Sequence, residues 1–440
     1  MKRSFSVAVL ALLLSAFAQT VFAETPGETL ATRAISPNSA EAQAAIAELR
    51  ALGPTGLDVL FKTYAREINE QAANPLLPPT PEWQRLSAAL DAVSQQKDSY
   101  LSALYWYTDL GEAKAAARAA HKPILSLRLL GKLSEEYSCA NSRFFRTILY
   151  SNAEVSKQLR ERFILHWESE RPAPRVTIDF GDGRKLERTL TGNSIHYLLD
   201  ARGRVIDALP GLYGPRAFLR SLAQAEQSLK APQQQANHAV AEPYSLARLN
   251  AINVAWYSDI EKIGGKAPQG FFVAQTPDGT PTAIQVAALA MTKRVTEANI
   301  LRSITATPEA LSAITDEALW NKLAQLHVAD AELDARSLGL IRRQTQRALS
   351  ATEAGANNEK TFAALVQKLQ ENIALDTVRN EYLLHTKLYS WFIGEENREL
   401  SKLNRRVYAE LFLTPATDPW LGLFSPEVYT ALDGGGVSRK

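Results

Sequence analysis

The chain has 440 residues, 46% of them hydrophobic, and its 49 Lys and Arg residues nearly balance 47 Asp and Glu residues, giving a formal net charge of +2. This length exceeds what one hydrophobic core normally serves, so two or three domains are expected. Acidic and basic residues are interspersed along the chain. Because nucleic-acid binders usually gather a basic excess on one face, nucleic acid is not an expected partner.

The N-terminus has the pattern of a secretory signal peptide over residues 1–23. Lys2 and Arg3 precede an apolar run at 7–18, and the tripeptide Val-Phe-Ala at 21–23 resembles a cleavage site. Cleavage would remove two positive charges, so the mature chain is formally neutral. The apolar run is shorter than the roughly 20 residues that span a bilayer. The sequence therefore predicts a periplasmic or secreted protein with no membrane contact after cleavage.

Residues 24–104 are predicted to form a helical N-terminal region. Apolar residues recur at helical spacing between 39 and 68, and Gly53-Pro54 divides this run into a helical hairpin. After the proline-rich stretch 74–81, residues 82–100 are predicted to form one long helix.

Helical and strand patterns alternate between residues 105 and 225, which predicts a compact α/β domain. The expected elements, in chain order, are a helix at 113–120, a strand at 124–129, a helix from Cys139 to Tyr150, a helix capped by Asn152, a strand at 163–167, a hairpin turn at 181–183, strands at 195–199 and 205–209, and a helix opened by Pro215.

Residues 226–242, rich in glutamine and poor in apolar residues, are predicted to be a linker. A mainly α-helical C-terminal domain is expected over 243–440. Its signals include helix starts at Pro308 and Pro426 and an apolar stripe formed by Phe362, Leu365, Leu369 and Ile373.

Cys139 is the single cysteine, so no internal disulfide can form. It follows the first long strand of the α/β region and stands at the predicted start of a helix. Unpaired backbone N–H groups and the positive end of the helix dipole favour a thiolate at such a position. The segment Cys139-Ala140-Asn141-Ser142 is therefore the first candidate for chemistry.

The run 139–155, CANSRFFRTILYSNAEV, resembles the thioredoxin-like superfamily, in which Cys-x-x-Cys is followed by a helix and a Ser/Asp-x-Glu-Val step. Trp106 and His121-Lys122-Pro123 upstream and residues 163–172 and 198–203 downstream extend the resemblance over 105–225. It implies a central thioredoxin-like α/β domain flanked by the two helical regions. Two family hallmarks differ: Ser142 replaces the second cysteine, and Asn193-Ser194 replace the cis-proline beside the thiol.

Two functions from different classes follow from this resemblance. In the first, Cys139 exchanges disulfides with protein partners as a monothiol, with Ser142 beside it. Asn141, Trp167, Asn193, Ser194 and His196 would then contact the partner. In the second, the domain is a non-catalytic binding or scaffolding module, which binds a protein or an assembly through the groove beside Asn193-Ser194 and through the helical domain. An exposed Cys139 favours exchange and a sealed Cys139 favours binding. No cofactor or metal is implied by either hypothesis.

Further polar residues leave alternatives open. The six histidines form no HExxH or Cys/His metal spacing, and His166 and His196 either activate the thiol or pack in the core. Between 376 and 385, Arg379, Glu381, Tyr382 and His385 stand at helical spacing. They either line a ligand cleft or form a buried polar network between helices.

Overall fold

The structure is a computed structural model that describes residues 26–189, 192–230, 241–265, 317–351, 359–393, 398–420 and 431. The predicted signal peptide and the helix starts at Pro308 and Pro426 lie outside these residues. Within the described ranges, no helix combines the length and the apolar character needed to cross a membrane.

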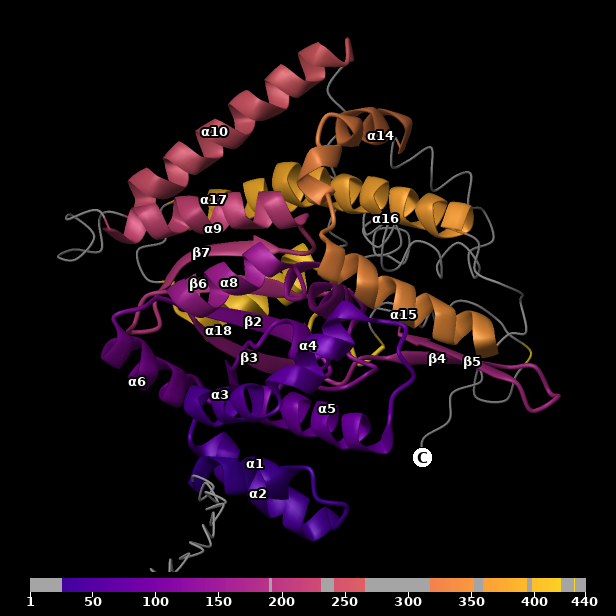
Figure 1. Cartoon of the computed structure of the whole chain (residues 1–440). Helices are drawn as coiled ribbons and strands as arrows, with labels where there is room; N and C mark the ends of the chain where they lie inside the picture. The colour runs from indigo at the N-terminus through magenta and orange to yellow at the C-terminus, as the bar shows by residue number, and fades with distance from the viewer. Residues whose placement is uncertain are drawn as a thin grey trace, which may run out of the picture.

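A mixed five-stranded sheet lies at the centre of the molecule (Figure 1). Its strands are β1 (Trp106–Tyr107), β2 (Ile124–Leu130), β3 (Ile164–Arg171), β6 (Ile195–Leu199) and β7 (Val205–Pro210). The spatial order is β1-β3-β2-β6-β7. The first three are parallel, whereas β6 is antiparallel to both β2 and β7. Strand β2 is buried along its whole length, as expected for a central strand covered on both faces.

Helices connect the strands largely as predicted. Helix α6 (Leu110–Ala120) joins β1 to β2, and the Asp109 side chain caps it by accepting from the Glu112 backbone N–H. Helix α8 (Ala153–Arg162) begins at the predicted cap, where Asn152 accepts from Glu154 and Val155. Helix α9 (Pro215–Lys230) follows β7. These caps satisfy backbone donors that a helix start leaves unpaired. The strands and helices alternate along this region, which confirms the predicted α/β class.

The connection between β3 and β6 is a separate two-stranded hairpin of β4 (Arg175–Asp179) and β5 (Lys185–Thr189). It closes at the predicted turn, where Gly181 and Gly183 have positive φ angles. Figure 1 shows the hairpin projecting from the body of the molecule, away from the central sheet.

The N-terminal region forms its own hydrophobic cluster beneath the sheet (Figure 1). Its helices are α1 (Pro26–Ala34), α2 (Ser39–Ala51), α3 (Pro54–Thr63), α4 (Ala65–Ala73) and α5 (Pro81–Ser94), followed by the short 3-10 helix η1 (Ser99–Leu101). The predicted helix 82–100 is too long, because α5 ends at Ser94 and Gln95 adopts a left-handed conformation with φ 59°. The Asp91 carboxylate then accepts from the Ser99 backbone N–H and holds the turn.

The described C-terminal elements are helical, as predicted. They are α10 (Ala241–Lys262), α14 (Glu317–Gln325), η5 (Val328–Ala331), α15 (Ala335–Ala351), α16 (Glu359–Arg379), the π-helical turn η6 (Asn380–His385), α17 (Thr386–Phe392), α18 (Leu400–Arg406) and the π-helical turn η7 (Val407–Leu411). In the predicted stripe of α16, Phe362 and Ile373 are buried, whereas Leu365 is exposed.

The C-terminal helices do not form a hydrophobic core separate from the sheet in the described structure. One cluster of buried residues joins Trp106 and Phe218 of the α/β region to Tyr389 and Phe412 of the C-terminal region. The predicted division at 243 therefore separates two halves of one core.

The predicted linker 226–242 also needs correction. Helix α9 continues to Lys230 and α10 starts at Ala241, so both ends of that stretch are helical. Leu222, Ala225 and Leu229 continue one apolar face of α9 against the core, which explains the extension beyond residue 225.

Candidate functional site

Cys139 occupies the N-cap position of α7 (Ala140–Phe144), which runs into the π-helical turn η2 (Phe145–Leu149). Its backbone N–H donates to the Leu130 carbonyl over 2.8 Å, and the Ser142 hydroxyl donates to the Cys139 carbonyl over 2.8 Å. The predicted place at a helix start is therefore confirmed. The cysteine is nevertheless 0% exposed, and Ser142 is also fully buried.

The chain's own C-terminal segment covers the sheet edge near Cys139. Asn193 Nδ2 donates to Thr414 Oγ1 over 2.8 Å, and the Tyr408 hydroxyl donates to the Asn193 carbonyl over 3.2 Å. The Tyr197 hydroxyl donates to Asn404 Oδ1 over 3.1 Å. Asn193 and Ser194 are consequently 2% and 0% exposed. The expected partner groove beside them is filled from α18 and η7, so these residues offer no accessible surface.

Asn141 is likewise 1% exposed and does not reach a surface. Its Nδ2 atom and the Ser194 Oγ atom are buried without a hydrogen-bond partner among the described residues. The polar side chains expected around the thiol thus belong to the interior, not to a site open to a protein substrate.

The two histidines that could have activated the thiol are packed and uncharged. His196 Nε2 lies 2.7 Å from the Tyr150 hydroxyl, and the ring packs against Phe145 and Phe218. Burial lowers the pKa of His196 to about 3. His166 lies 2.8 Å from Ser126 Oγ, and burial, helped by the Arg128 charge, lowers its pKa to about 3. Both histidines therefore pack in the core and do not activate the thiol.

Trp167 on β3 faces the N-terminal region instead of a partner surface. Its Nε1 donates to the Gln95 carbonyl over 2.9 Å, and the residue is 6% exposed. Every residue that the sequence placed around Cys139 is therefore buried inside the molecule.

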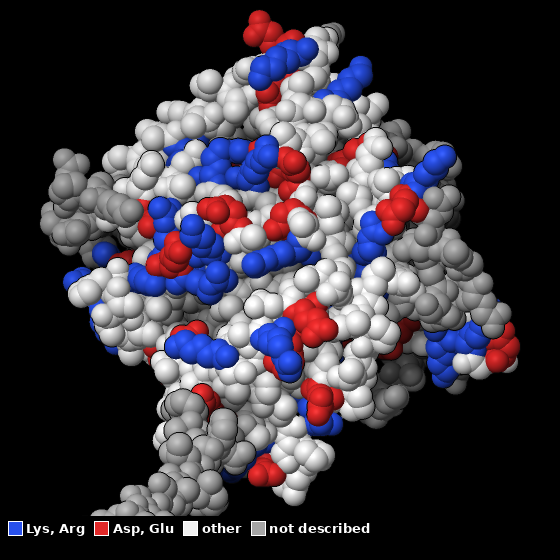
Figure 2. All heavy atoms as spheres, in the orientation of Figure 1, with Lys and Arg blue, Asp and Glu red and all other residues white. Residues whose placement is uncertain are grey.

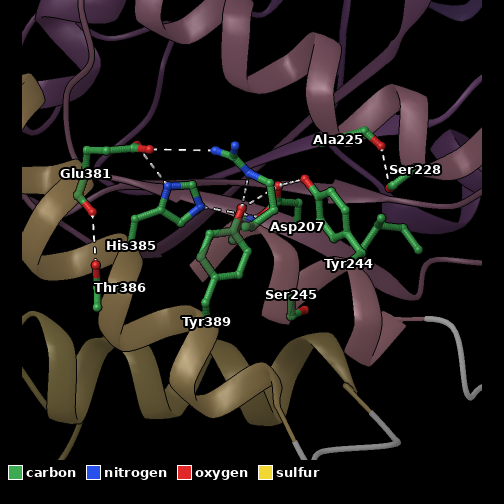
Figure 3. Close-up of polar contacts among 12 residues, drawn as sticks. Asp207, Ala225, Ser228, Tyr244, Ser245, Glu381, His385, Thr386 and Tyr389 are labelled. Carbon is green, nitrogen blue, oxygen red and sulfur yellow. Dashed lines mark hydrogen bonds and ion pairs between the residues drawn. The ribbon is translucent and has the colours of Figure 1, made fainter. Parts of the chain in front are cut away.

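The polar residues of 376–385 lead to a second cluster, between β7 and the C-terminal helices (Figure 3). The His385 imidazole lies between two carboxylates, with Nδ1 3.1 Å from Glu381 and Nε2 3.5 Å from Asp207 on β7. The hydroxyls of Tyr244 and Tyr389 donate to Asp207 over 2.6 and 3.0 Å. His385 is fully buried and Asp207 is 1% exposed.

Charge pairing sets the protonation of this cluster. Burial alone would lower the pKa of His385, but the adjacent carboxylates of Glu381 and Asp207 raise it to about 9. Burial would raise the pKa of Asp207, but hydrogen bonds from His385 and Tyr244 together with the imidazolium charge hold it below its usual value. The cluster therefore holds an imidazolium between two carboxylates at neutral pH.

A cavity of about 310 Å³ opens on the outer side of this cluster. It is bounded by α9, α10, η5 and the junction of α16 with η6, and its ionisable lining residues are Arg220, Arg248, His327, Asp330, Glu381 and Tyr382. Arg248 lies 3.6 Å from Glu381, which connects the cavity with the buried cluster. Both alternatives for the 376–385 segment therefore hold: Glu381 belongs to a buried network and also lines a cleft.

A second group of charged residues includes Arg220, His327 and Asp330 of the cavity lining. Arg220 makes a bidentate pair with Asp330, with both distances 2.7 Å. His327 Nε2 lies 2.5 Å from Asp259, which also accepts from the Tyr382 hydroxyl over 2.5 Å. The hydrogen bond to Asp330 raises the pKa of His327, and the hydrogen bond and charge of Asp259 raise it further. Burial of the ring acts in the opposite direction. Basic and acidic side chains are interspersed over the face that Figure 2 presents.

The sequence did not identify Asp207, Arg220, Arg248 or Asp330. Each stands in a segment without a recognisable motif. They come together because β7, α9 and α10 pack with η5 and η6, which lie much later in the sequence. Arg379, which the sequence grouped with Tyr382 and His385, is instead 1% exposed near the Trp320 ring.

Within the described residues, no three His, Cys, Asp or Glu side chains are arranged to hold a metal ion. Comparison of the chain with protein-family models, with curated proteins and with solved structures gives no match. Functional assignment therefore depends on the geometry of these two regions.

Proposed function

We propose that the chain is an exported thioredoxin-like protein that acts as a non-catalytic binding module. The strand order β1-β3-β2-β6-β7, with β6 antiparallel to β2 and Cys139 at the start of the helix after β2, supports the thioredoxin-like assignment. The sequence pattern of residues 1–23 supports export.

The complete burial of Cys139 is the observation that favours a binding role over a catalytic one. Disulfide exchange requires the thiolate to approach a sulfur atom of the partner's disulfide directly. Here α18 and η7 cover the neighbouring sheet edge, and Ser142 supplies no resolving thiol. Arg143 lies within the electrostatic range of Cys139, but that guanidinium is itself substantially buried, and burial is the main cause of its lowered pKa.

The β4–β5 hairpin supports a protein as the binding partner. Ile178 and Phe180 are 45% and 55% exposed on a hairpin whose other side chains are mostly charged. Exposed apolar residues rimmed by polar ones are characteristic of interaction sites. The hairpin lies in the connection between β3 and β6, and it projects from the body of the molecule (Figure 1). Its base lies near the helix that follows Cys139, because Arg143 donates to Thr189 Oγ1 over 2.8 Å.

The test is the rate at which iodoacetamide alkylates the purified protein, measured by mass spectrometry before and after denaturation in urea. We expect Cys139 to react only after denaturation, because no part of it is exposed in the fold. The matched control is Cys139→Ala combined with Ser390→Cys, which places a thiol at an exposed position of α17. This variant should react rapidly in the native state.

Rapid alkylation of native Cys139, with an apparent pKa well below the free-thiol value of about 8.5, would overturn the proposal in favour of monothiol exchange. The same preparation should not accelerate the reduction of insulin disulfides by dithiothreitol. Acceleration that disappears in Cys139→Ala would also contradict a non-catalytic role.

A further inference from the structure

The cavity between α9, α10, η5 and η6 is a second candidate site, and its lining includes neither Cys139 nor the β4–β5 hairpin. Two guanidinium groups line it, from Arg220 of α9 and Arg248 of α10. The Arg248 side chain is only 12% exposed, whereas that of Arg220 is 54% exposed. An anion entering the cavity would therefore meet one largely buried and one accessible guanidinium.

The two arginines lie close enough for their charges to interact. Hydrogen bonds to Asp330 raise the pKa of Arg220, and the charge of Arg248 opposes that rise. Like charges gathered around a cavity are costly unless counter-charges compensate them. Here Asp330 contacts Arg220 through two pairs of 2.7 Å and also lies 3.6 Å from His327, whereas Glu381 is 3.6 Å from Arg248 and is shared with His385. Arg248 thus has the longer ion pair of the two arginines, and its Nε also donates to the Tyr389 hydroxyl over 3.3 Å.

The charges around the cavity indicate the valence of the ligand. The basic residues that line the cavity are Arg220, Arg248 and His327, and the acidic residues that line it are Asp330 and Glu381. With His327 protonated, the positive charges of the lining exceed the negative ones by one. Because Asp330 and Glu381 line the cavity itself, a dianion such as phosphate meets more repulsion there than a monoanion.

The rest of the lining combines the polar side chains of Ser221, Gln224 and Thr377 with apolar ones. Ala251, Ile252 and Ala255 contribute one wall from α10, and Val378 contributes from α16. Ligand sites commonly combine such apolar surface with a few polar groups that fix orientation. The volume of about 310 Å³ accommodates several carbon atoms in addition to an anionic group.

We propose that this cavity binds a small organic monocarboxylate, whose carboxylate contacts Arg248 and Arg220 and whose aliphatic part contacts Ala251, Ile252 and Ala255. Guanidinium groups suit this ligand because their planar donors match a carboxylate in a two-bond geometry. This inference does not depend on the proposed role of the thioredoxin-like domain.

Hexanoate is the probe, titrated into the full-length protein by isothermal calorimetry near neutral pH. Hexanamide removes the charge while keeping the shape, hexylamine reverses the charge, and inorganic phosphate tests a purely anionic site. We expect saturable binding of hexanoate, at least tenfold weaker binding of hexanamide, and no saturable binding of hexylamine or phosphate.

Three variants test the location. Arg248→Met should weaken hexanoate binding at least tenfold, and Ala255→Trp should abolish it by filling the cavity from an exposed helix position. Arg216→Met is the matched control, because Arg216 lies one turn before Arg220 on α9 but pairs with Glu332 and does not line the cavity. It should bind hexanoate as the unmodified protein does.

Absence of saturable hexanoate binding would overturn the proposal, as would tighter binding of hexylamine. Equal binding of phosphate that is lost in Arg248→Met would show a site for inorganic anions instead. Thermal unfolding checks that each variant folds. If Arg248→Met does not fold, Ala255→Trp tests the location of the site alone. Unchanged hexanoate binding by Ala255→Trp would show that the ligand binds outside this cavity.

Discussion

Asn193 and Thr414 are 221 positions apart in the sequence, yet Asn193 Nδ2 donates to Thr414 Oγ1 over 2.8 Å. This contact ties the loop before β6 to the segment after η7. Arg171 reinforces it by donating to the Asp418 carbonyl over 3.0 Å. The C-terminal segment therefore acts as part of the central domain, covering the edge of the sheet where the thioredoxin-like resemblance predicted an open groove.

Removing the Tyr408 ring should open this cover. We expect Tyr408→Ala to lower the free energy of unfolding by about 3–5 kcal/mol, as for other buried aromatic residues, and to make native Cys139 accessible to iodoacetamide. Tyr408→Phe removes only the hydrogen bond to the Asn193 carbonyl and should cost about 1 kcal/mol with the thiol still protected. Urea unfolding and alkylation of the native protein measure both effects. Equal alkylation rates in the two variants would contradict a sealing role for the ring.

Substitutions of Cys139 should separate packing from chemistry. The residue is a small buried group in the main core, so Cys139→Ala should cost about 1 kcal/mol. Cys139→Ser should lower the free energy of unfolding by about 1–3 kcal/mol more than Cys139→Ala does, because a buried hydroxyl without a partner loses its hydration. The measurement is the urea midpoint of each variant. A serine variant as stable as the alanine variant would show that the position is hydrated.

Asp207 should be among the most sensitive positions in the molecule. Its carboxylate is 1% exposed and accepts from Tyr244 and Tyr389 while facing His385. We expect Asp207→Ala to lower the free energy of unfolding by about 3–5 kcal/mol, because it leaves a buried imidazolium short of a counter-charge. The matched control is Asp58→Ala on the exposed side of α3, which should change stability by less than about 0.5 kcal/mol. Similar losses in both variants would refute the special role of Asp207.

Because of the His385 imidazolium, the free energy of unfolding should fall as the pH rises above neutrality. Its folded-state pKa of about 9 exceeds the unfolded value of about 6.5. The stabilisation is therefore fully present below about pH 6.5 and is lost as the pH rises through about 9, by up to about 3 kcal/mol. Urea unfolding between pH 6 and 9.5 should show this loss in the unmodified protein and a smaller one in His385→Gln. His327→Gln is the comparison, since the pKa of His327 is also raised. Identical pH profiles for the unmodified protein and His385→Gln would exclude this origin.

Local signals made much of the α/β order predictable. Asn152 and Asp109 cap helices through contacts within three residues, and five of the seven residues of β2 are apolar. The end of α5 was not predictable in the same way. Gln95 adopts a left-handed conformation without being a glycine, and the turn is held by Asp91, whose contact with Ser99 spans eight residues.

The candidate sites depended on contacts that no local pattern encodes. The sequence indicated the helix-start position of Cys139, but the cover over it comes from Tyr408 and Thr414, more than 200 residues later. It also indicated Glu381, Tyr382 and His385 as a polar helix face. Their partners Asp207 and Arg248 come from β7 and α10, whose packing against η6 is a property of the whole fold.

The position of the covering segment affects how the chain can fold as it is made. A chain that emerges N-terminus first presents all five strands of the central sheet before residues 400–414 exist. Until those residues arrive, Asn193 lacks Thr414 and the buried face that includes Tyr197 stays exposed to water. Local elements can form during synthesis, but the core closes only after nearly the whole chain has left the ribosome. A nascent chain arrested before residue 400 should therefore remain sensitive to proteases in its central sheet.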